Sequence, residues 1–296
     1  MTIPTIATYP MPELAALPES RVDWTPQAQR AVLLVHDMQQ YFIDFFDVQA
    51  APIPALLSHI RALIEACTVV GVPVVFTAQP AVQSAEQRGV LQSWWGPGVT
   101  AHPERAAIVE ALRAQTQHAI VLDKWRYSAF SKSDLLQRLR DQGRDQLIVC
   151  GVYAHIGCML TVADAFMNDV QPFLVGDAVA DFSLEQHTMA LNYVSQRCGV
   201  VMAHKRVIEC LGRNRGLPLN IEDLRAEVAV VLELPASDLL LDDNLLYEGL
   251  DSIRLMSLVE RWQRAGCKLG FVELAAQPTL LQWWAMFQAH REGGKP

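Results

Sequence analysis

The sequence predicts an α/β protein: a doubly wound parallel sheet followed by a second, small all-α domain of four helices. Two observations favour this fold class. Short apolar runs alternate with helix-length segments over residues 31–175, and the last quarter of the chain changes to one-faced helical periodicity. A chain of 296 residues, 51% of them hydrophobic, is long enough for one sizeable core and a small satellite domain.

The first predicted strand is the continuous apolar run Ala31 to His36, which is typical of a buried parallel strand. Further strands are predicted at residues 72–77, 119–122, 146–150 and 172–175. In such sheets the ligand sits beyond the carboxyl ends of the strands. The residues expected to converge on one site are therefore Asp37, Gln79, Lys124 and the segment after Gly151.

The two domains are expected to be joined by residues 213–219, a short stretch that contains glycine and proline. The N-terminal domain would comprise residues 1–212, and the C-terminal domain residues 220–296. A linker of this length is too short to let the domains move far apart.

The C-terminal domain is predicted to begin with a helix after Asn220 that is apolar on one face: Ile221, Leu224, Val228, Val231 and Leu232. An acidic loop, residues 236–249, leads to a second helix that starts at Ser252 and ends at Gly266. The apolar face expected for this second helix is Ile253, Met256, Val259 and Trp262. A closing helix is expected after Pro278, with Thr279 as its N-cap and an apolar face of Leu280, Trp283, Trp284 and Phe287.

The start of the second helix carries the sequence Gly249, Leu250, Asp251, Ser252. A serine exposed at a helix start can hold a phosphodiester, because free backbone N–H groups and the positive dipole end face it. An ordinary N-cap is the alternative explanation. The order of helices and loops resembles acyl, aryl and peptidyl carrier domains. That resemblance implies a 4'-phosphopantetheine arm on Ser252, with Mg²⁺ near Asp251 during its attachment.

Charge is concentrated in this region, since residues 221–262 hold ten acidic residues against three basic ones. An acidic face would steer a carrier toward basic docking patches on its partner enzymes. A solvated helical surface explains the charge equally well.

Three segments of the N-terminal domain resemble the isochorismatase branch of the isochorismatase-like cysteine hydrolases. They are His36-Asp37-Met38-Gln39, Trp125 to Phe130, and Gly151-Val152 through Cys158. The implied fold is the isochorismatase-like sheet with Rossmann-like layers. Together with the carrier-like region, the resemblance extends over nearly the whole chain to bifunctional isochorismatase/aryl carrier proteins of catecholate siderophore biosynthesis.

One position departs from the wider superfamily, whose nucleophilic cysteine lies five residues after the Gly-Val pair. That position is Gly157 here, and Cys158 lies one place later. We interpret Cys158 as a packed thiol, because a shift of one residue at a strand-to-helix turn redirects the side chain. Covalent amide hydrolysis is not expected. The isochorismatase branch likewise has no cysteine nucleophile, since its substrate is a vinyl ether.

Cleavage of a vinyl ether requires protonation of its terminal methylene carbon, followed by attack of water on the oxocarbenium ion. The catalytic positions implied are Asp37, Lys124 and Gly157. We expect Asp37 to donate the proton, with burial and the anionic substrate favouring its protonated form. Lys124 would hold a substrate carboxylate or orient Asp37. A plain buried ion pair is the alternative for these two residues.

The resemblance implies that Gln79 and Arg88 bind a carboxylate, and that the substrate ring is enclosed by Phe42, Trp95, Tyr127 and Tyr153. Core packing is the alternative for each aromatic residue, and the sequence does not distinguish Trp94 from Trp95. We expect His155 to be a core histidine rather than a residue that supports the site. The spacing of Asp177, Asp181 and His187 lacks a ligand pattern, so no metal is expected in the hydrolase site.

The function implied by the resemblance is hydrolysis of isochorismate to pyruvate and 2,3-dihydro-2,3-dihydroxybenzoate, and carriage of 2,3-dihydroxybenzoate as a thioester for nonribosomal siderophore synthesis and iron acquisition. Expected partners are a phosphopantetheinyl transferase, a 2,3-dihydroxybenzoate-AMP ligase and a nonribosomal peptide synthetase, with a homodimer or higher oligomer formed through the N-terminal domain. One alternative is hydrolysis of 2-amino-2-deoxyisochorismate, as in phenazine pathways. Another is a catalytically silent docking scaffold.

Several function classes are disfavoured by composition. An acidic balance, with pI about 5.5, argues against nucleic acid as a partner. No apolar run has the length needed to span a bilayer and no secretory leader is recognisable, so a cytoplasmic protein is expected. The six cysteines form no CxxC pair, and we expect most of them to be reduced and buried.

Overall fold

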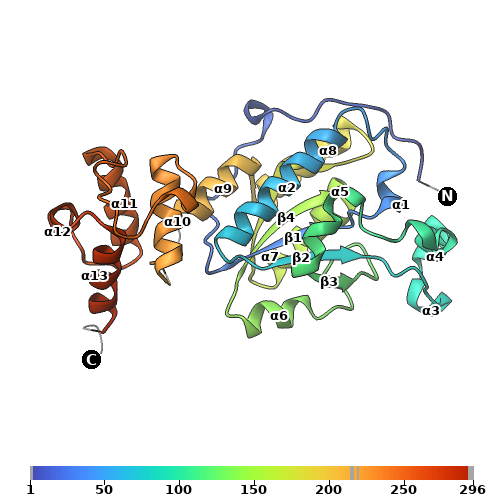
Figure 1. The fold of residues 1–296 in the computed structure, drawn as a ribbon. Coiled ribbons are helices and arrows are strands. Elements are labelled where there is room, and N and C mark those ends of the chain that lie inside the picture. The colour runs from blue at the N-terminus through green and yellow to red at the C-terminus, as the bar shows by residue number, and fades with distance from the viewer. Residues whose placement is uncertain (1–2, 214–216, 219, 293–296) are drawn as a thin grey trace. The chain divides into compact units, whose positions relative to one another are not determined.

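The computed structural model describes residues 3–213, 217–218 and 220–292. The chain divides into two compact units, residues 1–212 and residues 213–296. Each unit has its own apolar core, so each is described by itself. Figure 1 shows the strands in the first unit and only helices in the second.

The N-terminal unit is built on one six-stranded parallel sheet with the order β3-β2-β1-β4-β5-β6 (Figure 1). The strands are β1 (Ala31–His36), β2 (Val74–Ala78), β3 (Ile120–Asp123), β4 (Gln146–Val152), β5 (Gln171–Ala180) and β6 (Val200–Met202). The five predicted strands are confirmed. The edge strand β6 was not predicted, because three residues are too short a run to stand out from a helix-rich background.

Both faces of the sheet are covered by helices, because alternate residues of each buried strand point to opposite faces. On one face Leu33 and Val35 join a core cluster with Ile60 and Leu63 of α2 (Ile53–Val69). On the other face Leu34 joins a cluster with helices α6 (Leu135–Asp141), α7 (Met159–Met167) and α8 (Leu184–Arg197). Full burial of each such side chain contributes about 1.5–3 kcal/mol. The doubly wound arrangement is thus confirmed.

Shorter helices lie between the strands on the loops that follow them. They are α1 (Gln40–Ile43), α3 (Ala85–Arg88), α4 (Leu91–Trp95) and α5 (Glu110–Arg113), while α9 (His204–Arg213) follows the last strand. The strand order reverses between β1 and β4, which are neighbours in the sheet although β2 and β3 come between them in the chain. A crevice opens at such a reversal outside the carboxyl ends of the strands. Asp37 and Tyr153 directly follow these two strands.

In its described residues the C-terminal unit contains four α-helices, α10 (Ile221–Leu232), α11 (Ser252–Arg264), α12 (Phe271–Ala276) and α13 (Leu280–Glu292). Its core is centred on Trp262, whose ring meets Phe287 at 4.9 Å and 90° and Trp283 at 5.8 Å and 81°. These are edge-to-face contacts, which aromatic rings prefer. Asn220 accepts a hydrogen bond from the Asp223 N–H at the start of α10, and Thr279 accepts one from Gln282 at the start of α13. The predicted N-cap Thr279 is confirmed.

The buried face of α11 differs from the predicted one. Ile253 is 81% exposed and Met256 is 45% exposed. The buried residues are Leu255, Leu258, Val259 and Trp262. The prediction is confirmed for Val259 and Trp262 and wrong for Ile253 and Met256. Leu255 and Leu258 fit a helical face with Val259 and Trp262 as well as Ile253 and Met256 do, so periodicity alone did not separate the two pairs.

Two further properties concern the whole described chain. All six cysteines are buried, where the sequence predicted this of most of them. Within residues 3–213, 217–218 and 220–292, no helix combines the length and apolarity needed to cross a bilayer.

Candidate functional site

A pocket of about 580 Å³, counting its mouth, opens at the carboxyl ends of the strands in the N-terminal unit. Every residue predicted from the sequence for the hydrolase site lines it: Asp37, Phe42, Gln79, Arg88, Trp95, Lys124, Tyr127, Tyr153 and Gly157. These residues come from segments far apart in the sequence, and the sheet brings them together.

Asp37 is the centre of the polar part of this pocket. Lys124 Nζ donates a hydrogen bond to Asp37 Oδ2 at 2.6 Å, and Thr77 Oγ1 donates one to Asp37 Oδ1 at 2.7 Å. The backbone N–H of Asp37 donates to the same Thr77 hydroxyl at 3.1 Å. Asp37 has φ 47°, in the left-handed region that a non-glycine residue seldom adopts. The three contacts fix its carboxylate at the end of β1.

His36 lies directly before Asp37 in the chain and is fully buried. Its Nδ1 lies 2.8 Å from the Val152 carbonyl oxygen, and its Nε2 lies 3.3 Å from that of Tyr127. Burial lowers the pKa of His36 to about 4, and the Lys124 ammonium acts in the same direction. The imidazole is therefore neutral at pH 7.

Gly157 lies in a π-helical turn, Ala154–Cys158, between β4 and α7. It lines the pocket, whereas Cys158 does not. Cys158 is fully buried, and burial raises the pKa of its thiol well above the ordinary value. A buried, protonated thiol is a poor nucleophile, so the structure agrees with the interpretation of Cys158 as a packed thiol.

Arg88 and Gln79 form the second polar group of the pocket. Arg88 Nη1 donates to Gln79 Oε1 at 3.0 Å, and its Nε donates to the Gly96 carbonyl at 3.0 Å. Burial lowers the pKa of Arg88, yet a guanidinium stays charged at neutral pH. Gly98 has φ 60°, and a Cβ on it would lie 2.3 Å from Arg88 Nη2, so only glycine leaves room for this guanidinium.

The backbone around Gln79 is held by Gln39. Gln39 Oε1 accepts from the Gln79 N–H at 2.7 Å, and Gln39 Nε2 donates to the Gln79 carbonyl at 2.9 Å. Ser84 and Gln87 form a reciprocal capping box at the start of α3, the helix that carries Arg88. Local hydrogen bonds thus position both Gln79 and the helix that carries Arg88.

The walls of the pocket are aromatic. Trp95 Nε1 donates to the Tyr127 hydroxyl at 2.6 Å, and the Tyr153 hydroxyl donates to the Phe42 carbonyl at 2.7 Å. Trp95 lines the pocket and Trp94 is 66% exposed, which distinguishes the two tryptophans. Phe182 also lines the pocket and contacts Tyr153 at 4.6 Å between ring centroids.

Sequence reasoning did not propose three other pocket residues, His36, Tyr41 and Phe182, as site residues. Phe182 follows the carboxyl end of β5, where ligands bind in sheets of this kind. The predicted strand ended at residue 175, however, and β5 continues to Ala180. The extension includes the charged residue Asp177, which interrupts the apolar run.

His155 supports the turn that contains Gly157. Its backbone N–H and its Nδ1 both donate to the buried Asp181 carboxylate, at 2.6 and 2.5 Å. The Phe182 N–H donates to the same carboxylate at 2.8 Å. The half-buried His155 is thus satisfied by Asp181.

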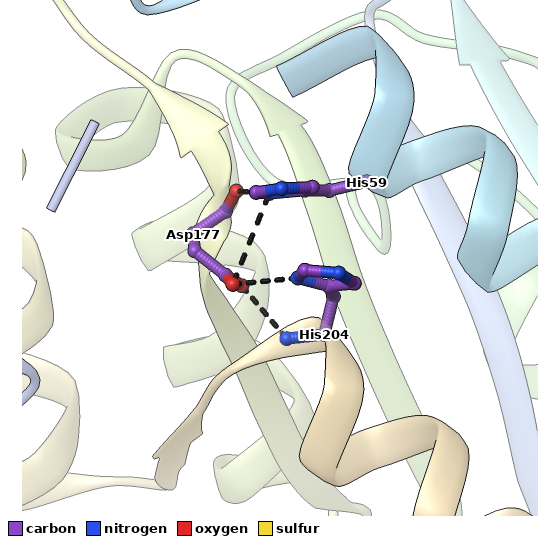
Figure 2. A group of neighbouring side chains, drawn as sticks. All are labelled: His59, Asp177 and His204. Carbon is purple, nitrogen blue, oxygen red and sulfur yellow. Dashed lines mark hydrogen bonds and ion pairs between the residues drawn. The ribbon is translucent and has the colours of Figure 1, made fainter. Parts of the chain in front are cut away.

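Asp177, the acidic residue of β5, has different partners from Asp181. In the part of the chain that the structure describes, one group could hold a metal ion: His59, Asp177 and His204, whose ligand atoms lie within 4.8 Å of one another. Figure 2 shows the two imidazole rings stacked beside Asp177. Their centroids lie 3.7 Å apart, and their planes meet at 16°. Imidazole binds an ion in its own ring plane at about 2.1 Å. Two nearly parallel, stacked rings cannot both do so.

This group instead anchors helix α9. Asp177 Oδ1 accepts from the His204 N–H at 2.7 Å, and Oδ2 accepts from His204 Nδ1 at 2.6 Å (Figure 2). His59 Nδ1 donates to the Asp177 carbonyl at 2.6 Å. A carboxylate that accepts backbone N–H bonds at a helix start is stabilising. His187 is not part of the group, because it contacts Tyr9 and the Gly176 carbonyl.

The second candidate site is the start of α11 in the C-terminal unit. Asp251 is the N-cap, and its side chain accepts from the Arg254 N–H at 2.8 Å. Leu250 is buried, and Arg254 Nη1 donates to the Gly249 carbonyl at 3.0 Å. Ser252 is the first helical residue and is exposed. The N-cap alternative for Ser252 is therefore wrong, and its hydroxyl is accessible to a modifying enzyme.

Two protein families match the chain. The isochorismatase domain family matches residues 31–206, and the phosphopantetheine attachment site family matches residues 222–286.

Named relatives match both units or one. The chain is 44% identical over 295 residues to an isochorismatase of Bacillus subtilis, covering 96% of this chain and 94% of that protein. It is 42% identical over 286 residues to enterobactin synthase component B of Escherichia coli, covering 97% and 98%. It is 47% identical over 212 residues to phenazine biosynthesis protein PhzD1 of Pseudomonas aeruginosa, covering 70% of this chain and 99% of that protein.

Solved structures resemble the fold of the N-terminal unit. A cysteine hydrolase from Pseudomonas syringae matches with a TM-score of 0.57 and 21% identity, over 65% of this chain and 96% of that one. An isochorismatase family protein from Burkholderia thailandensis matches with a TM-score of 0.56 and 23% identity, over 63% and 97%.

Proposed function

The chain belongs to the isochorismatase family, and on that premise we propose that its N-terminal unit hydrolyses isochorismate to pyruvate and 2,3-dihydro-2,3-dihydroxybenzoate. We propose further that its C-terminal unit carries 2,3-dihydroxybenzoate as a phosphopantetheine thioester for siderophore synthesis. The observation that carries the first proposal is the placement of Asp37, Lys124 and Gly157 in one pocket that also holds Arg88.

The first chemical step is protonation of the enolpyruvyl methylene carbon by the Asp37 carboxylic acid. The new C–H bond turns the vinyl ether into an oxocarbenium ion and leaves Asp37 as a carboxylate. Lys124 and Thr77, which donate to its two oxygens, stabilise that carboxylate as it forms. A positioned general acid of this kind contributes about 10²–10⁴-fold to the rate.

The second step is attack of water on the oxocarbenium carbon. The Asp37 carboxylate takes a proton from this water, which restores its acid form and gives a hemiketal. The hemiketal then collapses to pyruvate and the ring alcohol, with transfer of the hydroxyl proton to the departing oxygen. Protons therefore balance over the cycle. No covalent bond to the enzyme is formed, which is consistent with a glycine at position 157.

Substrate binding follows from the other polar group. Isochorismate is a dianion on a flat ring, and a buried guanidinium is suited to pair with one carboxylate. Arg88 and the amide of Gln79 supply that contact. The ring and enolpyruvyl group are enclosed by Phe42, Trp95, Tyr127 and Tyr153.

The carrier role follows from the start of α11. Ser252 is exposed there, next to the backbone N–H groups of the first helical turn, so the residues fit a phosphodiester. The 4'-phosphopantetheine arm would supply the thiol that forms the thioester. Asp251 would lie near the Mg²⁺ of the transferase during attachment.

The partners and location follow from this pathway. A phosphopantetheinyl transferase would load the arm, a 2,3-dihydroxybenzoate-AMP ligase would charge it, and a nonribosomal peptide synthetase would unload it, all in the cytoplasm. The N-terminal unit would form a homodimer or higher oligomer.

Hydrolysis of 2-amino-2-deoxyisochorismate is the second candidate. The observation in its favour is the 47% identity to the phenazine biosynthesis protein. That relative matches only 70% of this chain, and the two relatives that match both units are an isochorismatase and an enterobactin synthase component. Isochorismate is therefore preferred. A silent scaffold would not need the polar groups of the pocket.

The test compares pyruvate release from the two substrates, detected with lactate dehydrogenase and NADH. We expect turnover of isochorismate by wild type and the Ser252→Ala variant alike. In parallel, intact mass after incubation with coenzyme A and a transferase should rise by one phosphopantetheine in wild type alone. Preference for the amino compound, or loading of Ser252→Ala, would overturn the respective half of the proposal.

A further inference from the structure

We propose that the imidazole of His36 fills the space that any side chain at position 157 would need. On this proposal, His36 and Gly157 are a complementary pair that commits the pocket to chemistry without an enzyme nucleophile. The packing of His36 against Gly157 is argued from distances alone. The consequence for the reaction rests on the proposed function.

A side chain at position 157 would overlap the His36 ring. A Cβ built on Gly157 would lie 2.0 Å from His36 Cε1, 2.7 Å from Nε2 and 2.8 Å from Nδ1. Carbon atoms in non-bonded contact prefer about 3.5–4.0 Å. Even alanine at position 157 would therefore overlap the ring, and cysteine or serine would add a further atom to the same crowded space.

The ring cannot move aside at low cost. His36 has no exposed surface, and its two nitrogens contact the carbonyl oxygens of Val152 and Tyr127. These carbonyls belong to the end of β4 and to the loop after Lys124, so the ring is enclosed between two segments. The neutral ring donates its one N–H to one of these carbonyls, and rotation would break that buried hydrogen bond.

The placement has a chemical consequence because the pair adjoins the acid. His36 Nδ1 lies 3.8 Å from Asp37 Oδ2, and Gly157 lines the same pocket. A thiol or hydroxyl at position 157 would offer Asp37 a proton to remove, and Asp37 would then act as the base of a nucleophile. With an imidazole in that space, the carboxyl group of Asp37 remains available to the substrate carbon.

His36 is thus a positioning residue whose size selects the reaction class. Its neutral state is consistent with this role, since burial and Lys124 keep the pKa of the imidazole below neutral pH. An additional cation beside Asp37 would favour the carboxylate at the time when the acid is needed.

The test is a double-mutant cycle read by thermal unfolding, with no substrate present. The variants are Gly157→Ala, His36→Val and the two combined. The matched control is Gly212→Ala, because a Cβ at Gly212 meets nothing within 4 Å. We expect Gly157→Ala to lower the unfolding midpoint strongly when His36 is present and much less in the His36→Val background, while the control changes little.

A second measurement follows the chemistry. We expect Gly157→Cys alone to fold poorly, and His36→Val with Gly157→Cys to fold and to react with iodoacetamide. The thiolate introduced at position 157 would attack the methylene carbon of the reagent, a C–S bond would form, the C–I bond would break, and iodide would leave. Intact mass should show one added carbamidomethyl group, and wild type should show none because its cysteines are buried.

The proposal is overturned if Gly157→Ala or Gly157→Cys is as stable as wild type with His36 in place, or if His36→Val gives no relief. Neither readout uses isochorismate, so failure of the proposed substrate would leave the result intact. Conversely, the unfolding data could confirm the His36–Gly157 packing while the protein releases no pyruvate. That result would refute the proposed function and leave the packing proposal in place.

Discussion

Lys124 Nζ lies 2.6 Å from Asp37 Oδ2 in a site where both side chains are more than nine-tenths buried. A buried pair of opposite charges stabilises the fold little relative to apolar residues, but removal of one partner is costly because it leaves the other charge uncompensated. The retention of such a pair beside an open pocket is typical of a functional site. The plain structural ion pair remains the alternative that the predictions below test.

Replacement of Lys124 by alanine should destabilise the N-terminal unit by about 3–5 kcal/mol, because it leaves the Asp37 carboxylate buried without its cation. Urea unfolding measures this change. Arg113→Ala is the matched control, since its ion pair with Glu110 is exposed and contributes about 0–1 kcal/mol. If Lys124→Ala is as stable as Arg113→Ala, the buried Lys124–Asp37 pair contributes no more to the free energy of unfolding than an exposed pair, and the prediction is contradicted.

His36 should make stability depend on pH. Its folded pKa is about 4 and its ordinary value is 6.5, so between these values the unfolded state binds a proton that the folded state does not. Stability from this group is therefore present above pH 6.5 and is lost as pH falls toward 4, by roughly 3 kcal/mol in total. The measurement is the difference between wild type and His36→Asn in urea unfolding at pH 7, 6, 5 and 4. A difference that does not change with pH would contradict the prediction.

Trp262 should stabilise the C-terminal unit through a buried hydrogen bond. Its Nε1 donates to Glu227 Oε2 at 2.9 Å, and Glu227 is almost fully buried. Trp262→Phe removes that donor and should cost about 1–3 kcal/mol. Tyr247→Phe, at an exposed side chain, is the control. We expect the rate of pyruvate release to stay at the wild-type value, and a fall in that rate would contradict separate folding of the two units.

Asp251 should have two roles that substitution can separate. Asp251→Asn keeps an N-cap acceptor, so α11 should retain its stability, whereas Asp251→Ala should lose about 0.5–2 kcal/mol. Both changes remove the charge near the proposed Mg²⁺, and both should slow loading of Ser252 by the transferase. The rate of mass gain measures loading, and circular dichroism measures unfolding. Normal loading of Asp251→Asn would exclude the metal role.

Much of the fold could be predicted from the sequence, because buried parallel strands are continuous apolar runs. The run Ala31 to His36 is an example, since β1 has these bounds in the structure. β5 was predicted too short because Asp177, a strand residue, is charged and is stabilised only by His59 and His204 from distant segments. Two residues of the α11 face, Ile253 and Met256, were misassigned because Leu255 and Leu258 fit the same helical period with Val259 and Trp262.

The pocket residues were predicted from their positions after the carboxyl ends of strands and from the family resemblance. The structure brings Asp37, Lys124 and Arg88 together in one pocket. The contacts of His36 and His155 could not be predicted in this way. Each depends on a distance between segments: His36 to Gly157, and His155 to Asp181. Such distances exist only after folding, and no local pattern in the sequence encodes them.

The most direct test of the central claim is the rate of pyruvate release by Asp37→Asn compared with wild type at saturating isochorismate. Asparagine has nearly the same shape as aspartate but has no acidic proton to give to carbon. We predict a fall of about 10²–10⁴-fold in the rate. Because Asp37→Asn also leaves the buried Lys124 ammonium without its carboxylate, the unfolding midpoint should fall too, and the rate is compared at a temperature where both proteins are folded. An Asp37→Asn variant that releases pyruvate at the wild-type rate would contradict the assignment of Asp37 as the acid.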